Sequence, residues 1–250
     1  MIDGSSAKYG GDYGRYDITK RLVIIGPGYW LVDNGVIAEG ANSASIVTLN
    51  LKTDNIVVKG LVIRNLNITG AKAVVNRCHI GEITFESGAD NGIVSQCYIT
   101  GTPSGANYIQ MTNNIFTSTT SYALLSGFKN SYIAYNTFRN KNVQLSGVTN
   151  TTIEHNIWKE VKNSSTTNSL NNNYETDIIN TQATADFIDN DYFSLEIPTD
   201  VINTYGAFAG DSPYILSGVP SGPVILDLDV PTTVELGSKL NVTVKIGMVK

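Results

Sequence analysis

Apolar residues along this chain recur in short alternating runs, not at helical spacing. An apolar–x–x–small or polar–x–apolar hexapeptide occurs six times, and most copies follow a turn-forming cluster such as "TDN" or "GADN". The six copies are residues 58–63, 75–80, 94–99, 111–116, 133–138 and 153–158. Short runs bounded by Gly and Asn indicate β-strands, because a helix would place apolar residues three and four apart.

The fourth positions of these hexapeptides lie 17 to 22 residues apart: Leu61, Cys78, Cys97, Asn114, Asn136 and Asn156. A period near 20 residues is typical of a solenoid whose repeats stack as parallel strands. Further strands of the same coils are expected at 82–85, 122–127 and 142–147. Segments 20–26 and 44–51 are expected to form earlier, less regular coils.

Stacking at about 4.8 Å would turn each hexapeptide position into a column of neighbouring side chains. Two apolar columns are expected to face inward: Val58, Val75, Val94, Met111, Ile133 and Ile153, and Ile63, Ile80, Ile99, Phe116, Phe138 and Trp158. Between them, the three Asn of the fourth position should form a ladder of side-chain amides at a bend. Because neighbours on a strand point to opposite sides, Cys78 should face inward with Cys97, and His79 outward.

One outward column is unusually apolar: Val62, His79, Tyr98, Ile115, Thr137 and Ile157. Such a strip is either covered by corner loops or the C-terminal segment, or is a contact surface for a glycan or a protein partner. Tyrosine rings pack well against sugar faces. The candidate binding residues are therefore His79, Tyr98, Ile115, Tyr132 and Tyr135.

The stack of Asn at a bend resembles right-handed parallel β-helix proteins of the pectate-lyase-like type. The stretch "GAFAGDSPYILSGVPSGPVILDLDVP" (206–231) looks like the ending of uncharacterised exported β-helix proteins of gut Bacteroidetes, and "KRLVIIGPGYWL" (20–31) resembles an early coil of that group. The resemblance implies an all-β, right-handed parallel β-helix solenoid over 1–175, followed by a C-terminal closing segment over 176–250. It also implies an extracellular or cell-surface location. Because "MIDGSSAKYGG" lacks the features of a signal peptide, we expect a trimmed chain with an incomplete N-terminal cap.

The C-terminal quarter loses the repeat. Residues 161–175 are polar and rich in Asn, and are expected to form a long loop. From 220 onward, two alternating strands surround a connection punctuated by Pro and Gly. Two strands alone are marginal in water. They would pack on the solenoid, add to a sheet of another chain, or belong to a sandwich cut short.

Composition narrows the function classes. The chain is 42% hydrophobic and 16% charged, with a net charge of -5, which argues against nucleic-acid binding because that would need a basic stripe. No apolar run approaches the ~18 residues that span a membrane. Two cysteines are too few for a disulfide scaffold.

Catalytic candidates are few. The adjacent Glu154 and His155 could serve proton transfer, but their columns contain no second acid in the aligned coils, and glycoside hydrolysis needs two carboxylates about 5 to 9 Å apart. We therefore assign no catalytic residue. Asp186, Asp189 and Asp191 have a spacing compatible with a calcium loop, although Asx turns explain them as well. Calcium is the one cofactor that the sequence leaves open.

The sequence favours a non-catalytic surface or secreted module that binds saccharide or a protein partner. The choice of saccharide as the ligand rests on analogy with other proteins of this fold, and fold does not determine function. The first alternative is a polysaccharide lyase or glycoside hydrolase, including a phage tailspike-like depolymerase. The second is a structural subunit of a surface or fibre assembly. Nucleic acid is not an expected partner.

Overall fold

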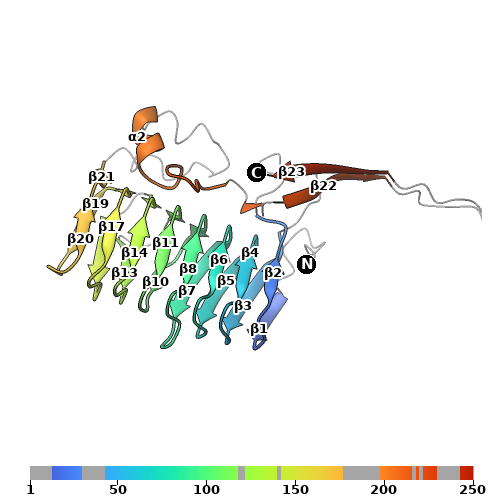
Figure 1. Ribbon diagram of the computed structural model, residues 1–250, viewed down its shortest axis with the longest axis horizontal. Coiled ribbons are helices and arrows are strands. Elements are labelled where there is room, and N and C mark those ends of the chain that lie inside the picture. Colours follow the sequence, from blue (N-terminus) through green and yellow to red (C-terminus); the bar gives the residue numbers. More distant parts are fainter. Residues whose placement is uncertain are drawn as a thin grey trace, which may run out of the picture.

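The chain winds into a parallel β-solenoid of about 7 turns (Figure 1). The structure, a computed structural model, describes residues 13–29, 43–117, 122–139, 142–176, 198–215, 218–219, 222–229 and 243–249. Each coil contributes to two sheets, and each strand pairs in parallel with the equivalent strand of the next coil. The prediction of an all-β parallel solenoid is confirmed.

The smaller sheet contains one three-residue strand from each coil. In the described part of the chain its order along the solenoid is β2 (Val23–Ile25), β4 (Val57–Lys59), β6 (Val74–Asn76), β8 (Ile93–Ser95), β11 (Gln110–Thr112), β14 (Tyr132–Ala134), β17 (Thr152–Glu154) and β20 (Ser169–Asn171). The middle residue of each strand faces inward and its two neighbours face outward. This alternation is the period of two that the sequence shows.

The larger sheet begins with long strands that later divide in two. The first coils supply β1 (Tyr13–Ile18), β3 (Ser45–Leu51), β5 (Val62–Ile68) and β7 (His79–Phe85). Beyond them, one half continues as β9 (Tyr98–Ile99), β12 (Ile115–Phe116), β15 (Thr137–Phe138), β18 (Ile157–Trp158) and β21 (Tyr174–Glu175). The other half continues as β10 (Pro103–Ser104), β13 (Tyr122–Ser126), β16 (Asn142–Ser146) and β19 (Glu160–Asn163). Segments 82–85, 122–127, 142–147, 20–26 and 44–51 thus contain strands as predicted.

Both predicted inward columns are confirmed. Every residue from Val58 to Ile153 in the first column has no exposed surface. In the second column the aromatic side chains stack, with 4.6 Å between the ring centroids of Phe116 and Phe138, and Trp158 follows at 6.0 Å from Phe138. Because equivalent residues repeat at the spacing of the strands, the core is a series of columns along the solenoid axis.

The bend between the two sheets is a left-handed turn held by the Asn ladder. The third hexapeptide residue has a positive φ in all six copies and in the coil that follows them: Gly60, Arg77, Gln96, Asn113, Tyr135, His155 and Asn172. In two coils the following Asn bonds the carbonyl that precedes this residue, as Asn136 Nδ2 does with Ala134 O at 3.0 Å. Residues other than glycine seldom adopt a positive φ, so a hydrogen bond that supports this conformation stabilises the turn. The ladder therefore supports the bend directly in these two coils.

The ladder also joins successive coils. Asn136 Nδ2 donates to Asn156 Oδ1 at 3.0 Å, and Asn114 Nδ2 donates to Asn136 Oδ1 at the same distance. Each Oδ1 also accepts the backbone N–H of the Asn in the preceding coil. All three predicted Asn are fully buried. Their polar atoms are satisfied inside the core, as buried amides require.

The two cysteines take the place of Asn in this column. Both are free and fully buried, as predicted. The Cys78 thiol lies 3.4 Å from Asn76 O and the Cys97 thiol 3.3 Å from Ser95 O, the carbonyl that Asn bonds in other coils. A thiol is a weak donor, but it has the right position to reinforce the bend.

The predicted loop at 161–175 is wrong. This stretch contains β19, β20 and β21, which pair with the preceding coil. "LNNNYE" (170–175) matches the hexapeptide except at its last position, Glu175, and Asn173 extends the ladder by accepting from Asn156 Nδ2 at 3.0 Å. Its strands expose one side because they form the last described coil, which explains the polar composition.

Two further elements follow. The helix α2 (Thr199–Thr204) lies near the last coils, and the chain then runs back along the solenoid toward the first ones (Figure 1). The strands β22 (Gly222–Asp229) and β23 (Thr243–Val249) form a two-stranded antiparallel sheet, which confirms the predicted pair of C-terminal strands. Figure 1 shows this pair extending beyond the coil that carries β2.

Candidate functional site

The apolar strip predicted from Val62 to Ile157 exists in the predicted register. Val62 pairs with His79, His79 with Tyr98, Tyr98 with Ile115, Ile115 with Thr137 and Thr137 with Ile157. The strip is not open, however: Ile115 is 0%, Thr137 1% and Tyr98 8% exposed. Of the two interpretations that the sequence left open, the structure supports coverage by the C-terminal segment.

The covering segment, called the strap below, comprises residues 198–215 and 218–219. Over the first part of the strip, Ala207, Phe208 and Tyr214 form a cluster with Tyr98, Ile115 and other buried side chains. Over the last part, Val201, Ile202 and Tyr205 pack with Ile157 and Tyr174. The strap thus runs along the solenoid in the direction opposite to the coil order (Figure 1).

Close approach of the strap depends on a glycine. Gly206 has a φ of +78°, and its N–H donates to His155 O at 2.7 Å. A Cβ at this position would lie 2.6 Å from both Ile157 Cδ1 and Thr137 Oγ1. The backbone of the strap therefore lies directly on the strip, where no side chain could fit.

Three side chains at the bend bind the strap by its backbone. Arg77 Nη1 donates to Val219 O at 2.8 Å, and Gln96 Nε2 donates to Pro213 O at 2.5 Å. Asn113 Nδ2 donates to Ala209 O at 2.7 Å and to Ala207 O at 3.1 Å. The left-handed backbone at these positions carries the side chains outward. They bond strap carbonyls, one of which, Ala207 O, also accepts the backbone N–H of Tyr214 at 2.7 Å.

Tyrosines surround His79 beneath the strap. The His79 ring lies 5.7 Å from that of Tyr29 and 5.1 Å from that of Tyr98, measured between centroids. The Tyr29 hydroxyl bonds that of Tyr214 in the strap, and burial raises the pKa of both phenols. Burial also lowers the pKa of His79 from 6.5 to about 4, since the imidazolium would lose hydration there.

The structure brings together four of the five candidate binding residues. Tyr98 and Ile115 lie under the strap, the half-buried His79 packs beside Tyr98, and Tyr135 lies beside the strap with its ring facing Gly210. Tyr132 is separate, on the outward face of β14. A ligand could reach the buried members only if the strap moved away. Their binding role stays a prediction.

The Glu154–His155 pair does not act as one unit. Glu154 Oε1 accepts the Tyr132 hydroxyl at 2.8 Å, and burial together with this bond raises the pKa of Tyr132. His155 stacks on Tyr135 at 4.9 Å and on Tyr205 of the strap at 6.0 Å. Each member therefore belongs to a different contact.

A second surface was missed by the sequence analysis. On the outward face of the larger sheet, one register position is polar in seven successive coils: Asp17, Asn50, Asn67, Thr84, Ser104, Ser126 and Ser146. We call this the polar column. It escaped notice because the first coils were too irregular to align. Alternation of polar and apolar residues in "TLNLK" and "RNLNITG" was the available signal.

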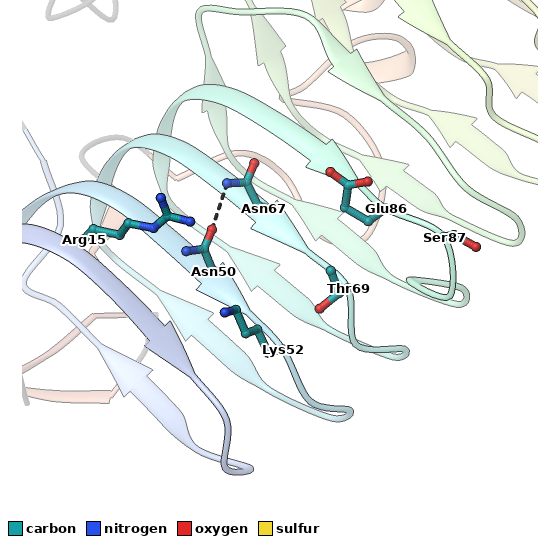
Figure 2. A pocket seen from close by; sticks show the side chains of 7 residues that line it. All are labelled: Arg15, Asn50, Lys52, Asn67, Thr69, Glu86 and Ser87. Atoms are coloured by element: carbon teal, nitrogen blue, oxygen red, sulfur yellow. Dashed lines mark hydrogen bonds between the residues drawn. The ribbon is translucent and has the colours of Figure 1, made fainter.

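A groove lies over the polar column in the first coils (Figure 2). Its volume is about 490 Å³, and seven polar or charged residues line it: Arg15, Asn50, Lys52, Asn67, Thr69, Glu86 and Ser87. Asn67 Nδ2 donates to Asn50 Oδ1 at 2.8 Å. The groove thus presents amides and hydroxyls in its centre, with Arg15 on one side and Glu86 on the other (Figure 2).

An ion pair borders this groove. Lys52 Nζ lies 2.5 Å from Asp17 Oδ2, and Asn50 Nδ2 donates to Asp17 Oδ1 at 2.6 Å. The bond from Lys52, with a smaller contribution from Asn50, lowers the pKa of Asp17. The carboxylate is exposed, so solvent screens the pair. Its main effect is to hold Asn50 and Lys52 in place along the groove.

A second hollow lies at the other end of the same sheet. Its volume is about 390 Å³, and β16 and β19 contribute most of its lining, including Gln144 and Lys162. Eight strands separate the two ends, from β1 through β7 and β10 to β19. At about 4.8 Å per strand step, the polar face extends for roughly 34 Å.

Acidic groups and metals can be considered only within the described residues. There, no group of three or more His, Cys, Asp and Glu side chains is placed to hold a metal. The calcium candidates Asp186, Asp189 and Asp191 lie outside the described residues. Within the described part of the chain, no helix is long and apolar enough to cross a membrane.

Comparisons with known proteins found no matching family model, no matching curated protein and no matching solved structure. The description of this chain therefore rests on its own fold and site. The chain is a parallel β-solenoid with one outward strip closed by a strap from its own C-terminal region and one outward polar column, with a hollow near each end of the sheet that carries it.

Proposed function

We propose that this protein is a non-catalytic saccharide-binding module that holds an extended glycan chain along the polar face of its larger sheet. The observation that carries this proposal is the continuity of the polar column between the two hollows. A regular polymer repeats its hydroxyl groups, and this face repeats amides and hydroxyls at the strand spacing. Repeated weak hydrogen bonds then add along the polymer.

The charges of the groove suit a ligand that is largely neutral. Asp17 and Lys52 neutralise each other, and Arg15 and Glu86 stand on opposite sides with opposite signs. A strongly charged polymer would meet repulsion at one of these two ends. We therefore propose amides and hydroxyls as the main contacts, which fits a polyhydroxylated ligand.

The wider assignment is also a proposal. We propose an extracellular or cell-surface location, and kinship with the exported β-helix proteins of gut Bacteroidetes whose ending the stretch 206–231 resembles. Both rest on sequence resemblance alone. Calcium stays a candidate cofactor through Asp186, Asp189 and Asp191.

The test is a binding panel of plant, host-mucin and bacterial polysaccharides. Protein retained on each polysaccharide is measured by pull-down, and released oligosaccharides are sought by mass spectrometry. Retention without new products supports the proposal. Retention with new oligosaccharides identifies an enzyme, and unsaturated ends identify a lyase. Absence of retention across the panel contradicts a saccharide-binding function.

A pair of matched variants locates the site. Thr84 lies in the polar column of the larger sheet, whereas Thr112 lies on the outward face of the smaller sheet, and both are half-buried. Replacement by Ile keeps a β-branched side chain in each strand. Thr84→Ile removes one hydroxyl contact, which should weaken binding about 3- to 10-fold. Thr112→Ile should leave affinity unchanged, and equal losses would place the ligand elsewhere.

An assembly role is the second candidate. Within the described residues, four of the five exposed large hydrophobic residues lie in the first coil: Tyr16, Leu22, Val23 and Ile25. Such a cluster at one end of a solenoid favours contact with another protein. Light scattering after size-exclusion chromatography gives the mass in solution. A stable oligomer that Val23→Lys returns to a monomer would favour assembly, and a monomeric wild type would argue against it.

A further inference from the structure

The two C-terminal strands, called the arm below, have one apolar face. The strands β22 and β23 pair in an antiparallel register that shifts by one residue between Ile225 and Asp227. Alternate positions of a strand share a face of the sheet. The register therefore places six apolar residues on one face: Pro223, Ile225, Leu228, Val244, Ile246 and Met248. On the other face, Asp227 lies opposite Lys245 and Asp229 opposite Thr243.

The register shift keeps this face apolar. Leu226 is the extra residue at the shift. Without the shift, Asp227 would lie opposite Val244, on the same face as Ile246. A two-stranded sheet is marginally stable by itself in water. An apolar face that is preserved in this way indicates that the arm packs against another surface.

The solenoid exposes apolar residues at the end from which the arm extends. Leu22 is 46%, Val23 65% and Ile25 37% exposed, and all three lie in the first coil. Figure 1 shows the arm extending beyond the coil that carries β2 and away from the later coils. The apolar face of the arm is therefore not placed along the coils of its own solenoid.

An outward row of aliphatic residues leads from this first coil across the smaller sheet. Val23 pairs with Val57, Val57 with Val74, and Val74 with Ile93. The last three are half-buried on the outward face of the sheet. We call these four residues the aliphatic row. It ends after four coils, because the next residue at this register position is Gln110.

We infer that two copies of this chain form a symmetric dimer in which the first coils face each other and each arm lies across the aliphatic row of the other copy. The arm and the exposed first coil lie at the same end of the chain (Figure 1). A two-fold axis at that end therefore places each arm beside the coils of the other copy. The strands of the arm then cross those of the smaller sheet at a large angle, one of the two usual ways in which sheets pack.

The lengths of the arm and of the row agree with this arrangement. The eight residues of β22 span about 26 Å, because a strand rises about 3.3 Å per residue. This length equals about five coil steps of about 4.8 Å. The arm can thus cross the junction between the two first coils and cover the coils from Val23 to Ile93, where the aliphatic row ends.

The buried area is that of a stable dimer. A face of two strands is about 10 Å wide, so two arms and two aliphatic rows together bury roughly 1,000 Å². The contact between the first coils, with Leu22 and Ile25, adds to this area. Specific protein–protein interfaces bury about 1,200 to 2,000 Å² in total.

This inference does not rest on the proposed glycan site. The polar column lies on the larger sheet, whereas the aliphatic row lies on the smaller one. It also goes beyond a general assembly role, because it names the partner as a second copy and assigns the two surfaces that meet. The glycan site and the dimer therefore hold or fail separately.

Light scattering after size-exclusion chromatography of the full chain, over a range of loading concentrations, tests the inference. The wild type should have twice the mass of one chain. Ile246→Lys places a charge on the apolar face of the arm, and Val74→Glu places one in the aliphatic row. Each change occurs twice in the dimer, so each should raise the dissociation constant about 100-fold or more.

Two controls carry the same new residues outside the contact. Thr243→Lys lies in β23 but on the opposite face of the arm, and Thr152→Glu lies in the register position of Val74 on a coil beyond the reach of the arm. Both should leave the dissociation constant unchanged. Thermal unfolding followed by circular dichroism checks that each variant is folded. If Val74→Glu does not fold, Val57→Glu carries the same expectation, and Met248→Lys can replace Ile246→Lys.

A mixing experiment distinguishes arm exchange from a simple end-to-end contact. In a dimer of the Ile246→Lys and Val74→Glu variants, one unchanged arm lies on an unchanged row. The other arm, with its Lys, lies on the row with the Glu, so opposite charges meet. An equimolar mixture should therefore recover the mass of two chains at concentrations at which each variant alone is a monomer.

Three results would overturn the inference. The first is a wild type with the mass of one chain at every concentration. The second is a dimer that Ile246→Lys and Val74→Glu weaken no more than their controls do. The third is a mixture of these two variants that stays monomeric, because reciprocal exchange requires that they complement each other.

Discussion

Removal of one Asn from the centre of the ladder should destabilise the protein far more than removal of the Asn at its end. Asn136 is fully buried. Its Nδ2 donates to Met111 O at 2.9 Å and to Ala134 O and Asn156 Oδ1 at 3.0 Å, and its Oδ1 accepts two bonds from Asn114 at 3.0 Å. Asn136→Ala breaks all five bonds at a site with no exposed surface.

The magnitude follows from what each broken bond leaves behind. A typical internal hydrogen bond contributes about 1 kcal/mol net, and a buried group left without a partner costs about 1 to 3 kcal/mol. The side chain of Asn114 keeps its bond to Val94 O, whereas the backbone N–H of Asn114 loses its acceptor. The carbonyls can also relax toward neighbouring donors. We expect a loss of about 3 to 5 kcal/mol in the free energy of unfolding.

Asn173→Ala is the matched control in the same column. Asn173 is half-buried in the last described coil, donates to Ile153 O and accepts two bonds from Asn156. Because the Asn173 side chain is partly exposed, its removal opens a path for water to the groups that it leaves, so the loss should be about 1 kcal/mol. Urea unfolding followed by circular dichroism gives both values, provided that tryptophan fluorescence shows the same transition. Equal losses for the two variants would refute the reasoning that burial makes the ladder stabilising.

Three further changes probe the core, the strip and the turns. Cys78→Ser should lower the melting temperature through a loss of about 1 to 3 kcal/mol, because a hydroxyl is more costly to bury than a thiol; an unchanged value would contradict the inward placement. Ile115→Asp places a charge under the strap and should destabilise by about 3 kcal/mol or more, with glycan retention unchanged below the melting temperature. Gly70→Ala would put a Cβ 2.0 Å from Thr53 O. It should cost about 2 kcal/mol or more by differential scanning calorimetry, and a neutral result would mean that this turn readily rearranges.

The columns could be predicted because their cause is local. Side chains on a strand alternate with a period of two, and parallel stacking turns each repeat position into a column. Knowledge of the hexapeptide was therefore enough to place Val58, Ile115 and Asn136 correctly. The same reasoning placed His79 outward and Cys78 inward, although adjacent Cys and His residues could suggest a metal or catalytic pair.

The last coil was missed for a reason that is also local. Residues 170–175 keep the hexapeptide except that Glu175 replaces its last apolar residue, and Asn173 follows Asn156 by 17 residues, a step already seen twice upstream. The polar composition of the stretch nevertheless favoured the prediction of a loop over that of a coil. A coil at the end of a solenoid has a neighbour on one side only, so fewer of its positions must be apolar. Leu170 is half-buried where the equivalent residue of inner coils is fully buried.

The polar face shows where alignment limits prediction. The first coils lack the regular hexapeptide, so Asn50 and Asn67 were not compared with Thr84 or Ser126. Their register becomes visible only when the strands are paired. Because short polar side chains at outward positions are common on any sheet, only their continuity over successive coils distinguishes this face from ordinary solvated surface.

Contacts of the strap could not be predicted, yet two signs of it are present in the sequence. Its bonds connect residues about 50 to 140 positions apart, such as Gly206 with His155 and Arg77 with Val219, and no periodicity reports such pairs. The apolar strip indicated that something must cover it. Beside it, the bend carries Arg77, Gln96 and Asn113, long or amide side chains with N–H donors. An apolar strip beside a row of side-chain N–H donors predicts that a polypeptide segment covers the strip and that its backbone carbonyls accept these hydrogen bonds. In this chain, that occupant is a segment of its own C-terminal region.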